Sequence, residues 1–179
     1  MNAVVKQGEE GALESLPGPS RETILKFEGA LRPLPQTDCP LKHTFAPGMY
    51  AREIFLPADT FIVGKIHKHA HLNIVTRGRC TVVTEHGRRE IDATEGPVTF
   101  TSEPGTKRAL YVHEETVWTT IHAVQSTDLA EIERDIIAPD YPELDAFMAR
   151  ECERLISANE REGRVTLRPG SQSQSVDPQ

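Results

Sequence analysis

Three histidines at alternate positions are the densest chemical signal in the sequence. His67, His69 and His71 lie in the stretch 64–73, which also contains Asn73. Alternate side chains of a straight β-strand point to the same face, so all four would share one face. Imidazole nitrogens bind divalent transition metals at about 2.0–2.2 Å, and the spacing therefore predicts a metal site. The alternative is a solvent-exposed polar face on an edge strand.

Residues 49–124 must position these histidines, and they have the pattern of short strands. The alternation of β-branched or aromatic residues with turn signals predicts strands near 49–56, 60–67, 71–76, 79–85, 88–93, 97–102, 107–113 and 116–124. Turns are expected between them, including one at Arg77-Gly78. About eight short strands in so few residues favour an antiparallel barrel or sandwich. A parallel α/β sheet is excluded, because the stretch has no room for crossover helices.

Helices are predicted on both sides of this β-rich segment. Ser20 can cap a helix over 21–31, and 35–47 is predicted to be a loop. Asp128 can cap a further amphipathic helix, and another helix is expected after Pro142. The chain therefore divides into four parts: a flexible arm (1–19), a barrel with its leading helix (20–126), C-terminal helices (127–162) and a disordered tail (163–179).

The stretch around the histidines resembles the first sequence motif of the cupin superfamily. That motif has a His-x-His pair, a glutamate and a later glycine; His67 and His69 match the pair, and Gly78 matches the glycine. The glutamate is absent. Counting forward from the pair reaches Asn73, and counting backward from Gly78 reaches His71. His71 is the better ligand of the two, because a neutral amide binds transition metals weakly.

The second cupin motif is matched by Gly96 and by the turn at Pro104-Gly105. The resemblance implies a metal-binding histidine three residues after that turn, where this sequence has Arg108. An arginine stays protonated and cannot bind a metal ion, so a fourth ligand has to come from elsewhere. His122, on the last predicted strand, is the candidate. The alternative is that His122 is a surface or packed histidine.

Arg108 suggests a second kind of chemistry at the barrel mouth. A guanidinium forms two parallel hydrogen bonds with a carboxylate or phosphate, so Arg108 is a candidate substrate-binding residue. Three lysines would add positive charge nearby, namely Lys65, Lys68 and Lys107. The alternative is that Arg108 forms an ion pair with Glu114 or Glu115, which are expected in a turn.

The resemblance covers residues 36–126 and implies the fold class. This is a mainly β fold, the cupin-type double-stranded β-helix or antiparallel jelly-roll barrel, here with a short N-terminal helix and C-terminal helices. The phrases Gly-Lys-Ile-His-Lys and Thr-Val-Trp-Thr-Thr-Ile-His are similar to small cupin-like proteins of bacteriophages and prophages. Cupins include dioxygenases, isomerases, lyases, sugar-binding modules and regulators, so the fold alone does not select a reaction.

The acidic composition narrows the classes of partner. The 179 residues carry a net charge of −7, which argues against binding to nucleic acid or to an anionic membrane surface. No stretch approaches the roughly 20 apolar residues of a membrane helix, and Met1 to Ser15 lack the apolar segment of a secretory signal. Three widely spaced cysteines fit free thiols in a reducing compartment. We expect a cytoplasmic protein of a bacterium or phage-infected host, with virion association as the alternative.

The leading functional hypothesis is a metal-binding cupin that acts on a small polar or anionic molecule. His67, His69, His71 and His122 would hold an iron, manganese, nickel or zinc ion, and Arg108 would orient an acidic group. The reaction would be that of a dioxygenase, an isomerase or a lyase. The alternative is a non-enzymatic cupin, either a ligand-binding module or a phage structural or accessory protein whose terminal arms dock on a virion partner. A homodimer is expected in either case.

Overall fold

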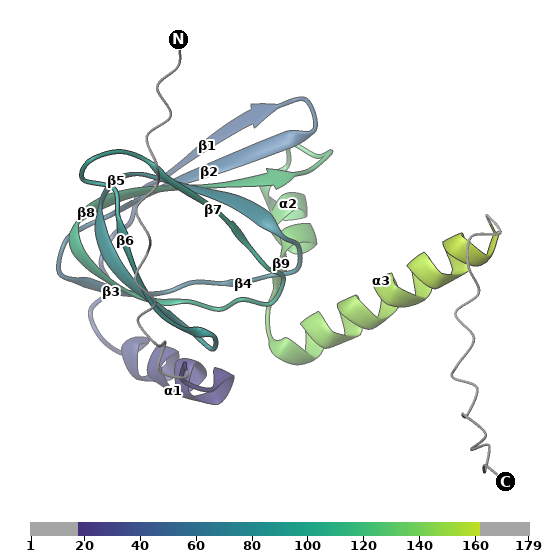
Figure 1. Ribbon diagram of the computed structural model, residues 1–179, viewed down its shortest axis with the longest axis horizontal. Helices are drawn as coiled ribbons and strands as arrows, with labels where there is room; N and C mark the ends of the chain where they lie inside the picture. Colours follow the sequence, from purple (N-terminus) through teal and green to yellow (C-terminus); the bar gives the residue numbers. More distant parts are fainter. Residues whose placement is uncertain (1–17, 162–179) are drawn as a thin grey trace, which may run out of the picture.

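The computed structural model describes residues 18–161, which form a β-barrel accompanied by three helices (Figure 1). The chain begins with the helix α1 (Arg21–Leu31). The strands that follow are β1 (Leu41–Ala46), β2 (Met49–Leu56), β3 (Thr60–Val63), β4 (Ile66–His67), β5 (His71–Thr84), β6 (Gly87–Asp92), β7 (Val98–Ser102) and β8 (Ala109–Ala123). The last elements are α2 (Leu129–Ile136), β9 (Ile137–Ala138) and α3 (Tyr141–Arg161). The prediction of a mainly β fold with a leading helix and C-terminal helices is confirmed.

Two long antiparallel strands, β5 and β8, lie at the centre of the barrel. The seven-stranded sheet has the order β1-β2-β8-β5-β6, while β3 also pairs with β8 and β7 also pairs with β5. Because β5 and β8 each pair with several strands along their length, the sheet curls into the ring seen in Figure 1. The ring encloses an apolar core that includes Val75, Cys80, Val112 and Trp118. All pairings are antiparallel, as predicted.

A bulge at Gly78 allows β5 to serve two neighbours. The predicted turn at Arg77-Gly78 is wrong, because β5 runs through both residues. Its ladder with β8 shifts register between Val75 and Cys80, and Gly78 has φ +92°, a conformation that favours glycine. The strand therefore bends without ending, and it pairs with β7 before the bulge and with β6 after it.

Replacing Gly78 with alanine should lower the free energy of unfolding by about 3 kcal/mol. The new Cβ would suffer left-handed backbone strain and would also clash with the Glu115 carbonyl oxygen. Chemical denaturation of the variant and the parent measures the difference. Gly48→Ala is the matched control: its φ is also positive, at +74°, but nothing lies within 4 Å of the added Cβ. Equal losses in the two variants would contradict the role of the close approach.

Three further segments differ from the sequence expectations. The loop predicted for 35–47 contains β1, an edge strand whose side chains are all exposed, so no buried-exposed alternation marks it. The strand predicted for 60–67 is divided into β3 and β4. The strands predicted for 107–113 and 116–124 are the single strand β8, so Glu114 and Glu115 lie in a strand and not in a turn.

The N-terminal helix is capped and packed as its sequence indicates. The Ser20 side chain accepts a hydrogen bond from the Thr23 backbone N–H, which satisfies a free donor of the first turn. Ile24 is buried, and the Phe27 ring contacts the Phe61 ring of β3 edge-to-face at 5.8 Å. The helix therefore packs on the outer face of the barrel.

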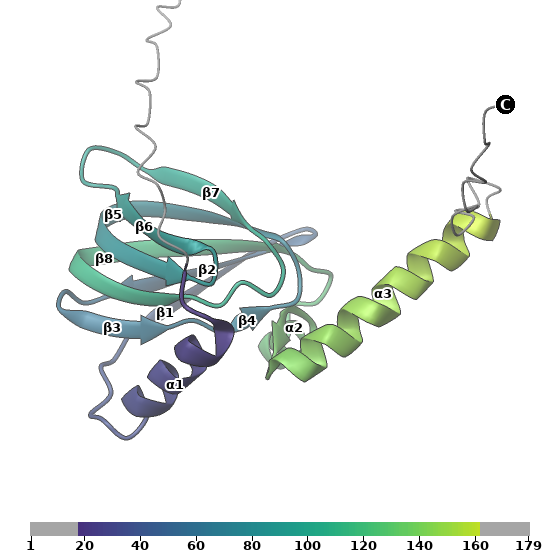
Figure 2. The ribbon, with the colours of Figure 1, turned by 60° about the horizontal axis from the view of Figure 1, so that its bottom comes forward.

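The C-terminal helices differ in how much they bury. Asp128 caps α2, whose Ile132 and Ile136 are buried against the barrel. Helix α3 begins at Tyr141, next to Pro142, after which the sequence predicts a helix. It projects away from the barrel (Figure 2), and Leu144 is its buried residue. No helix within 18–161 is both long enough and apolar enough to cross a membrane. The cysteines are free thiols, as expected, at Cys39, Cys80 and Cys152.

Candidate metal centre

Three histidines from three separate strands meet inside the barrel. His67 ends β4, His71 begins β5, and His122 lies next to the end of β8. Each side chain is only 3–5% exposed. Neighbouring strands fix the three backbones: His67 lies opposite Ile137 of β9, while His71 and His122 lie opposite residues of β7 and β2. The protein therefore holds three buried imidazoles on a rigid frame.

The three rings are close enough to share one ion. Their centroids are 4.2 Å apart for His67 and His71, 4.7 Å for His71 and His122, and 5.0 Å for His67 and His122. Candidate ligand nitrogens of all three lie within 4.8 Å of one another. Two nitrogens on one ion are at most ~4.2 Å apart, so small ring rotations are sufficient. Imidazole donors suit Zn, Cu, Fe and Ni.

Two of the ring nitrogens have no hydrogen-bond partner within the described chain. They are the buried Nδ1 of His67 and Nε2 of His122. A buried polar atom without a partner costs stability, so such atoms call for a ligand. His71 differs, since its Nδ1 lies 3.2 Å from the His69 carbonyl oxygen and can donate to it. That bond would leave Nε2 of His71 as the free lone pair. The donor set thus fits a divalent transition metal.

Burial and nearby positive charges keep these imidazoles neutral. Desolvation is the main cause that lowers the pKa of His67 to about 2 and that of His122 to about 3. The neighbouring histidines and Arg52 lower both pKa values further. Desolvation also lowers the pKa of His71, with smaller contributions from Arg108 and Arg52. At neutral pH no proton has to be displaced before a metal ion binds.

Acid should destabilise the metal-free protein below about pH 6.5. In the unfolded chain His67 and His122 take up protons near pH 6.5, whereas in the folded protein they do so near pH 2–3. The unfolded state therefore binds more protons between these values, and stability falls as the pH falls. At pH 5 each histidine should cost about 2 kcal/mol. Urea denaturation at pH 7 and pH 5 measures the loss. The loss of unfolding free energy between pH 7 and pH 5 should be unchanged in the control variant His86→Gln, which alters an exposed histidine. The loss should be smaller in His122→Gln. An unchanged loss in His122→Gln would contradict the buried histidines as the origin of the pH dependence.

His69 lies outside the cluster, although the sequence places it between two of its members. The chain bends between β4 and β5 and does not run as one straight strand, so alternate side chains no longer share a face. The bend exposes His69, whose ring contacts Phe147 of α3 edge-to-face at 5.1 Å. The same bend brings His67 and His71 together. His122 supplies the third imidazole from a strand distant in sequence.

Asn73 is buried nearby but is committed to other contacts. Its amide nitrogen donates to Ser102 Oγ at 2.6 Å, and its amide oxygen accepts from Trp118 Nε1 at 3.0 Å. Both ends of the amide are therefore occupied by hydrogen bonds. The side chain supports the wall behind His71, which lies opposite Ser102 in the β5–β7 ladder.

Arg108 belongs to the same network and has no acidic partner in residues 18–161. Its guanidinium donates a hydrogen bond to Ser102 Oγ. Desolvation, followed by repulsion from Arg89, lowers the Arg108 pKa to about 10, so the group stays charged at neutral pH. The alternative ion pair is not formed, because Glu114 pairs with Arg79 and Glu115 pairs with a different arginine, Arg77.

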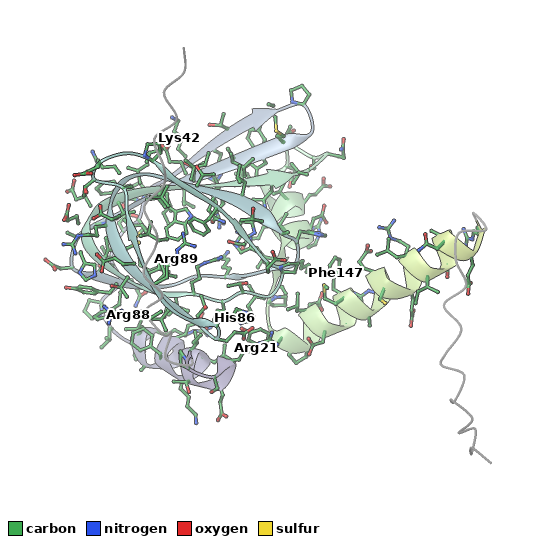
Figure 3. The ribbon with its side chains drawn as sticks, viewed as in Figure 1. Arg21, Lys42, His86, Arg88, Arg89 and Phe147 are labelled. Atoms are coloured by element: carbon green, nitrogen blue, oxygen red, sulfur yellow. The ribbon has the colours of Figure 1, made fainter. Side chains whose placement is uncertain are left out.

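Arg89 joins Arg108 at a cavity that the sequence did not reveal. The two arginines line a space of about 220 Å³ together with Ile91 and Phe100. The Arg89 guanidinium lies 4.2 Å above the Phe100 ring, within the ring of strands (Figure 3). Alternation along β6 was the available signal, because Arg89 shares a face with the buried Ile91 and Ala93. Lys65, Lys68 and Lys107 lie elsewhere, in a cleft outside the barrel.

Comparisons with known proteins find similarity in solved structures. No family model and no curated protein matches the sequence. A cupin-2 domain protein from Shewanella frigidimarina is 10% identical, with a TM-score of 0.38, over 59% of this chain and 100% of its own. An RmlC-like cupin with a double-stranded β-helix from Methanocaldococcus jannaschii is 11% identical, with a TM-score of 0.39, over 49% and 82%. A cupin 2 barrel protein from Salinispora arenicola is 14% identical, with a TM-score of 0.38, over 66% and 92%. These values concern the fold and assign no reaction.

The residues of the two cupin-like motifs take different roles in this structure. From the first motif, His67 reaches the cluster and His69 does not, and the shortened spacing brings in His71. From the second motif, Arg108 lies close to the cluster but acts as a charged donor. The third imidazole, His122, comes from a strand outside both motifs.

Proposed function

We propose that this protein is a metal-binding cupin that binds a small anionic molecule next to its metal ion. The observation that carries the proposal is the cluster of three buried, neutral histidines, His67, His71 and His122, two of which have an unpartnered ring nitrogen. We infer a divalent iron, manganese, nickel or zinc ion as the resident metal. An ion in this place would polarise a substrate oxygen or activate dioxygen.

The anionic character of the ligand follows from the charges around the cluster. Histidine ligands leave the full positive charge of the ion uncompensated, and within the described chain no carboxylate joins the cluster. Arg52 and Arg108 add positive charge, as their effects on the histidine pKa values indicate. We infer that Arg108, steadied by Ser102, holds a carboxylate or phosphate of the substrate. Arg89 would contribute a second guanidinium to the same cavity.

The chemistry assigned to the protein side chains is binding and orientation. His67, His71 and His122 fix the ion, while Asn73 and Ser102 fix the wall from which Arg108 extends. Dioxygenase, isomerase and lyase reactions all use an ion with open positions beside an oriented substrate. The proposal therefore concerns the binding of the ion and of an oriented substrate, which the three reactions share.

A second candidate is a non-enzymatic cupin that binds its ligand without turnover. Arg108 favours it, because it occupies the place where the resemblance implies a metal-binding histidine. The two candidates differ in one measurement: a metal-loaded protein that binds small carboxylates but converts none, with or without dioxygen, would be a binding module. An origin in a phage stays a prediction. Docking on a virion through the arms also stays a prediction, since 1–17 and 162–179 lie outside the described residues.

A homodimer is also part of the proposal. Helix α3 offers exposed apolar side chains at Met148, Leu155 and Ile156 as a contact surface. Size-exclusion chromatography with light scattering should give twice the chain mass at micromolar concentration. A monomer under these conditions would contradict the dimer and leave the metal site unaffected.

Metal analysis of the purified protein tests the central part of the proposal. After expression in metal-supplemented medium and purification without chelator, we expect close to one equivalent of a transition metal per chain. A metal content below about a tenth of an equivalent per chain would contradict the metal assignment.

A further inference from the structure

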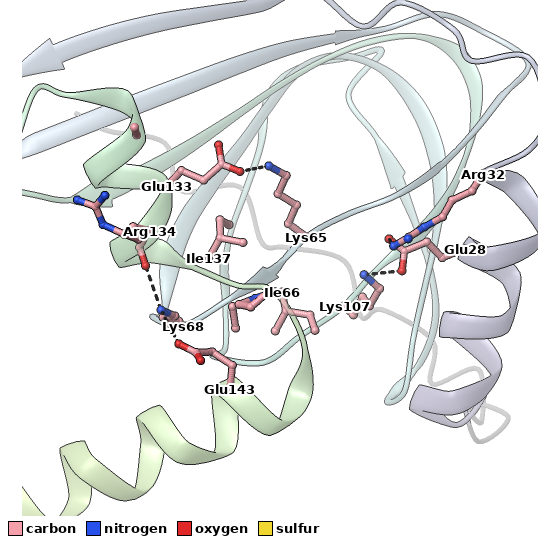
Figure 4. A pocket seen from close by; sticks show the side chains of 13 residues that line it. Glu28, Arg32, Lys65, Ile66, Lys68, Lys107, Glu133, Arg134, Ile137 and Glu143 are labelled. Carbon is pink, nitrogen blue, oxygen red and sulfur yellow. Dashed lines mark hydrogen bonds and ion pairs between the residues drawn. The ribbon is translucent and has the colours of Figure 1, made fainter.

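A charged cleft lies outside the barrel, away from the cavity of Arg108. Its volume is about 690 Å³, and its walls come from α1, β4, α2, β9 and the start of α3 (Figure 4). Basic residues outnumber acidic ones among those that line it. The basic side chains are Lys65, Lys68, Lys107, Arg32 and Arg134, and the acidic ones are Glu28, Glu133 and Glu143.

Two of the lysines in this cleft are nearly buried. Lys68 is 8% exposed and Lys107 is 5% exposed, which is unusual for lysine because burial of an ammonium is costly unless it is paired. Lys107 donates to the Gly64 carbonyl at 3.1 Å and lies 3.1 Å from a Glu28 oxygen. Lys68 donates to a backbone carbonyl at 3.0 Å, and its nearest carboxylate oxygen, on Glu143, is 3.6 Å away. An ammonium has three donors, so each lysine retains at least one.

Each carboxylate of the cleft already forms an ion pair with one of the lysines. Glu28 pairs with Lys107, Glu143 with Lys68 and Glu133 with Lys65, as the dashed lines of Figure 4 mark. Two arginines then remain in excess. Arg32 approaches only the engaged Glu28, at 3.6 Å, and the Arg134 guanidinium has no ion pair with any residue of 18–161. The cleft thus carries two positive charges more than its acids neutralise.

We propose that this cleft binds the phosphate group of a small molecule, at a site separate from the metal centre. A dianion would balance the two excess charges, and compact lysine ammonium groups with free donors suit phosphate oxygens. The short strand β4 separates the two sites. Alternate residues of a strand point to opposite sides, so Ile66 and Lys68 face the cleft while His67 faces the metal cluster. Phosphate in the cleft would therefore bind against the strand that carries one of the proposed metal ligands.

Titration of the full-length protein with inorganic phosphate tests this site. The experiment uses protein without added metal, at constant ionic strength and pH 8, and is followed by calorimetry and by amide chemical shifts of Lys68 and Ile137. We expect saturable binding in the millimolar range or tighter. Arg134→Ala should weaken binding by about fivefold. Arg150→Ala on α3 removes the same charge outside the cleft and should leave the affinity unchanged.

A variant that is expected to bind phosphate more tightly distinguishes a specific effect on the cleft from a general loss of structure. Glu143→Gln removes the acid that competes for Lys68, and it should tighten phosphate binding by about twofold to fivefold. Absence of saturable binding, equal affinities in Arg134→Ala and Arg150→Ala, or weaker binding in Glu143→Gln would each overturn the proposal. Succinate serves as the dicarboxylate arm, and tighter binding of succinate than of phosphate would overturn the assignment to phosphate. None of these outcomes depends on the metal content of the barrel.

Discussion

Replacing His122 with alanine should lower the affinity of the protein for its metal ion at least about a hundredfold. Loss of a group that merely supports a metal ligand costs ten- to a hundredfold, and His122 is proposed as a ligand itself. The remaining pair, His67 and His71, would leave the ion with two protein donors. Competition against a chromophoric chelator, with Zn²⁺ or Co²⁺ as the probe, measures the affinity of the variant and the parent.

His69→Ala is the matched control for this experiment. His69 belongs to the same sequence cluster as the proposed ligands, but its ring lies outside the barrel against Phe147. Its removal should leave the metal affinity within about twofold of the parent. Thermal unfolding of both variants without metal checks that each is folded. If His69→Ala lost the metal and His122→Ala kept it, the straight-strand arrangement would be correct and the structural one wrong.

Replacing Arg108 with methionine should weaken anion binding to the metal-loaded protein by about a hundredfold. The guanidinium is largely desolvated and has no acid to neutralise it in the described chain, so an anionic ligand would gain a strong charge-assisted contact. Truncating one partner of such a pair costs about 2–5 kcal/mol. Titration of oxalate into Co²⁺-loaded protein, followed by the visible absorption of the ion, measures the affinity.

Two further substitutions separate charge from geometry at this position. Arg108→Lys keeps the charge but loses the planar fork, and it should give an intermediate loss. Arg88→Met removes an exposed arginine from the opposite face of β6 and should leave oxalate binding unchanged. Equal oxalate affinities in Arg108→Met and Arg88→Met would contradict the role of Arg108 and would leave the metal site without its proposed substrate anchor.

The barrel was predictable because its strands carry local signals. The turn at Pro104-Gly105 and the caps at Ser20 and Asp128 depend on short-range chemistry that a sequence displays directly. Edge strand β1 gave no such signal. All its side chains are exposed, and it exists because β2 offers a free edge for pairing. Gly78 was ambiguous for another reason, since a glycine with positive φ serves a bulge as well as a turn.

The metal centre was predictable in its residue types and only partly in its membership. His67 and His71 lie four positions apart, but their convergence depends on a bend between two strands. The three residues that connect these strands, 68–70, contain no pattern that predicts the bend. His122 joins them through the long-range pairing of β8 with β2 and β5, which no local pattern encodes. Asn73 was a candidate by counting alone, and its contacts with Ser102 and Trp118 appear only in three dimensions.

Anomalous diffraction at the absorption edge of the bound metal tests the central claim most directly. Crystals of protein purified and grown without chelator should give one anomalous peak per chain, within about 2.0–2.3 Å of a ring nitrogen from each of His67, His71 and His122. A peak at His69, or no peak in crystals whose solution contained the metal in excess, would contradict the account. The barrel would stand in that case, while the chemistry assigned to its interior would not.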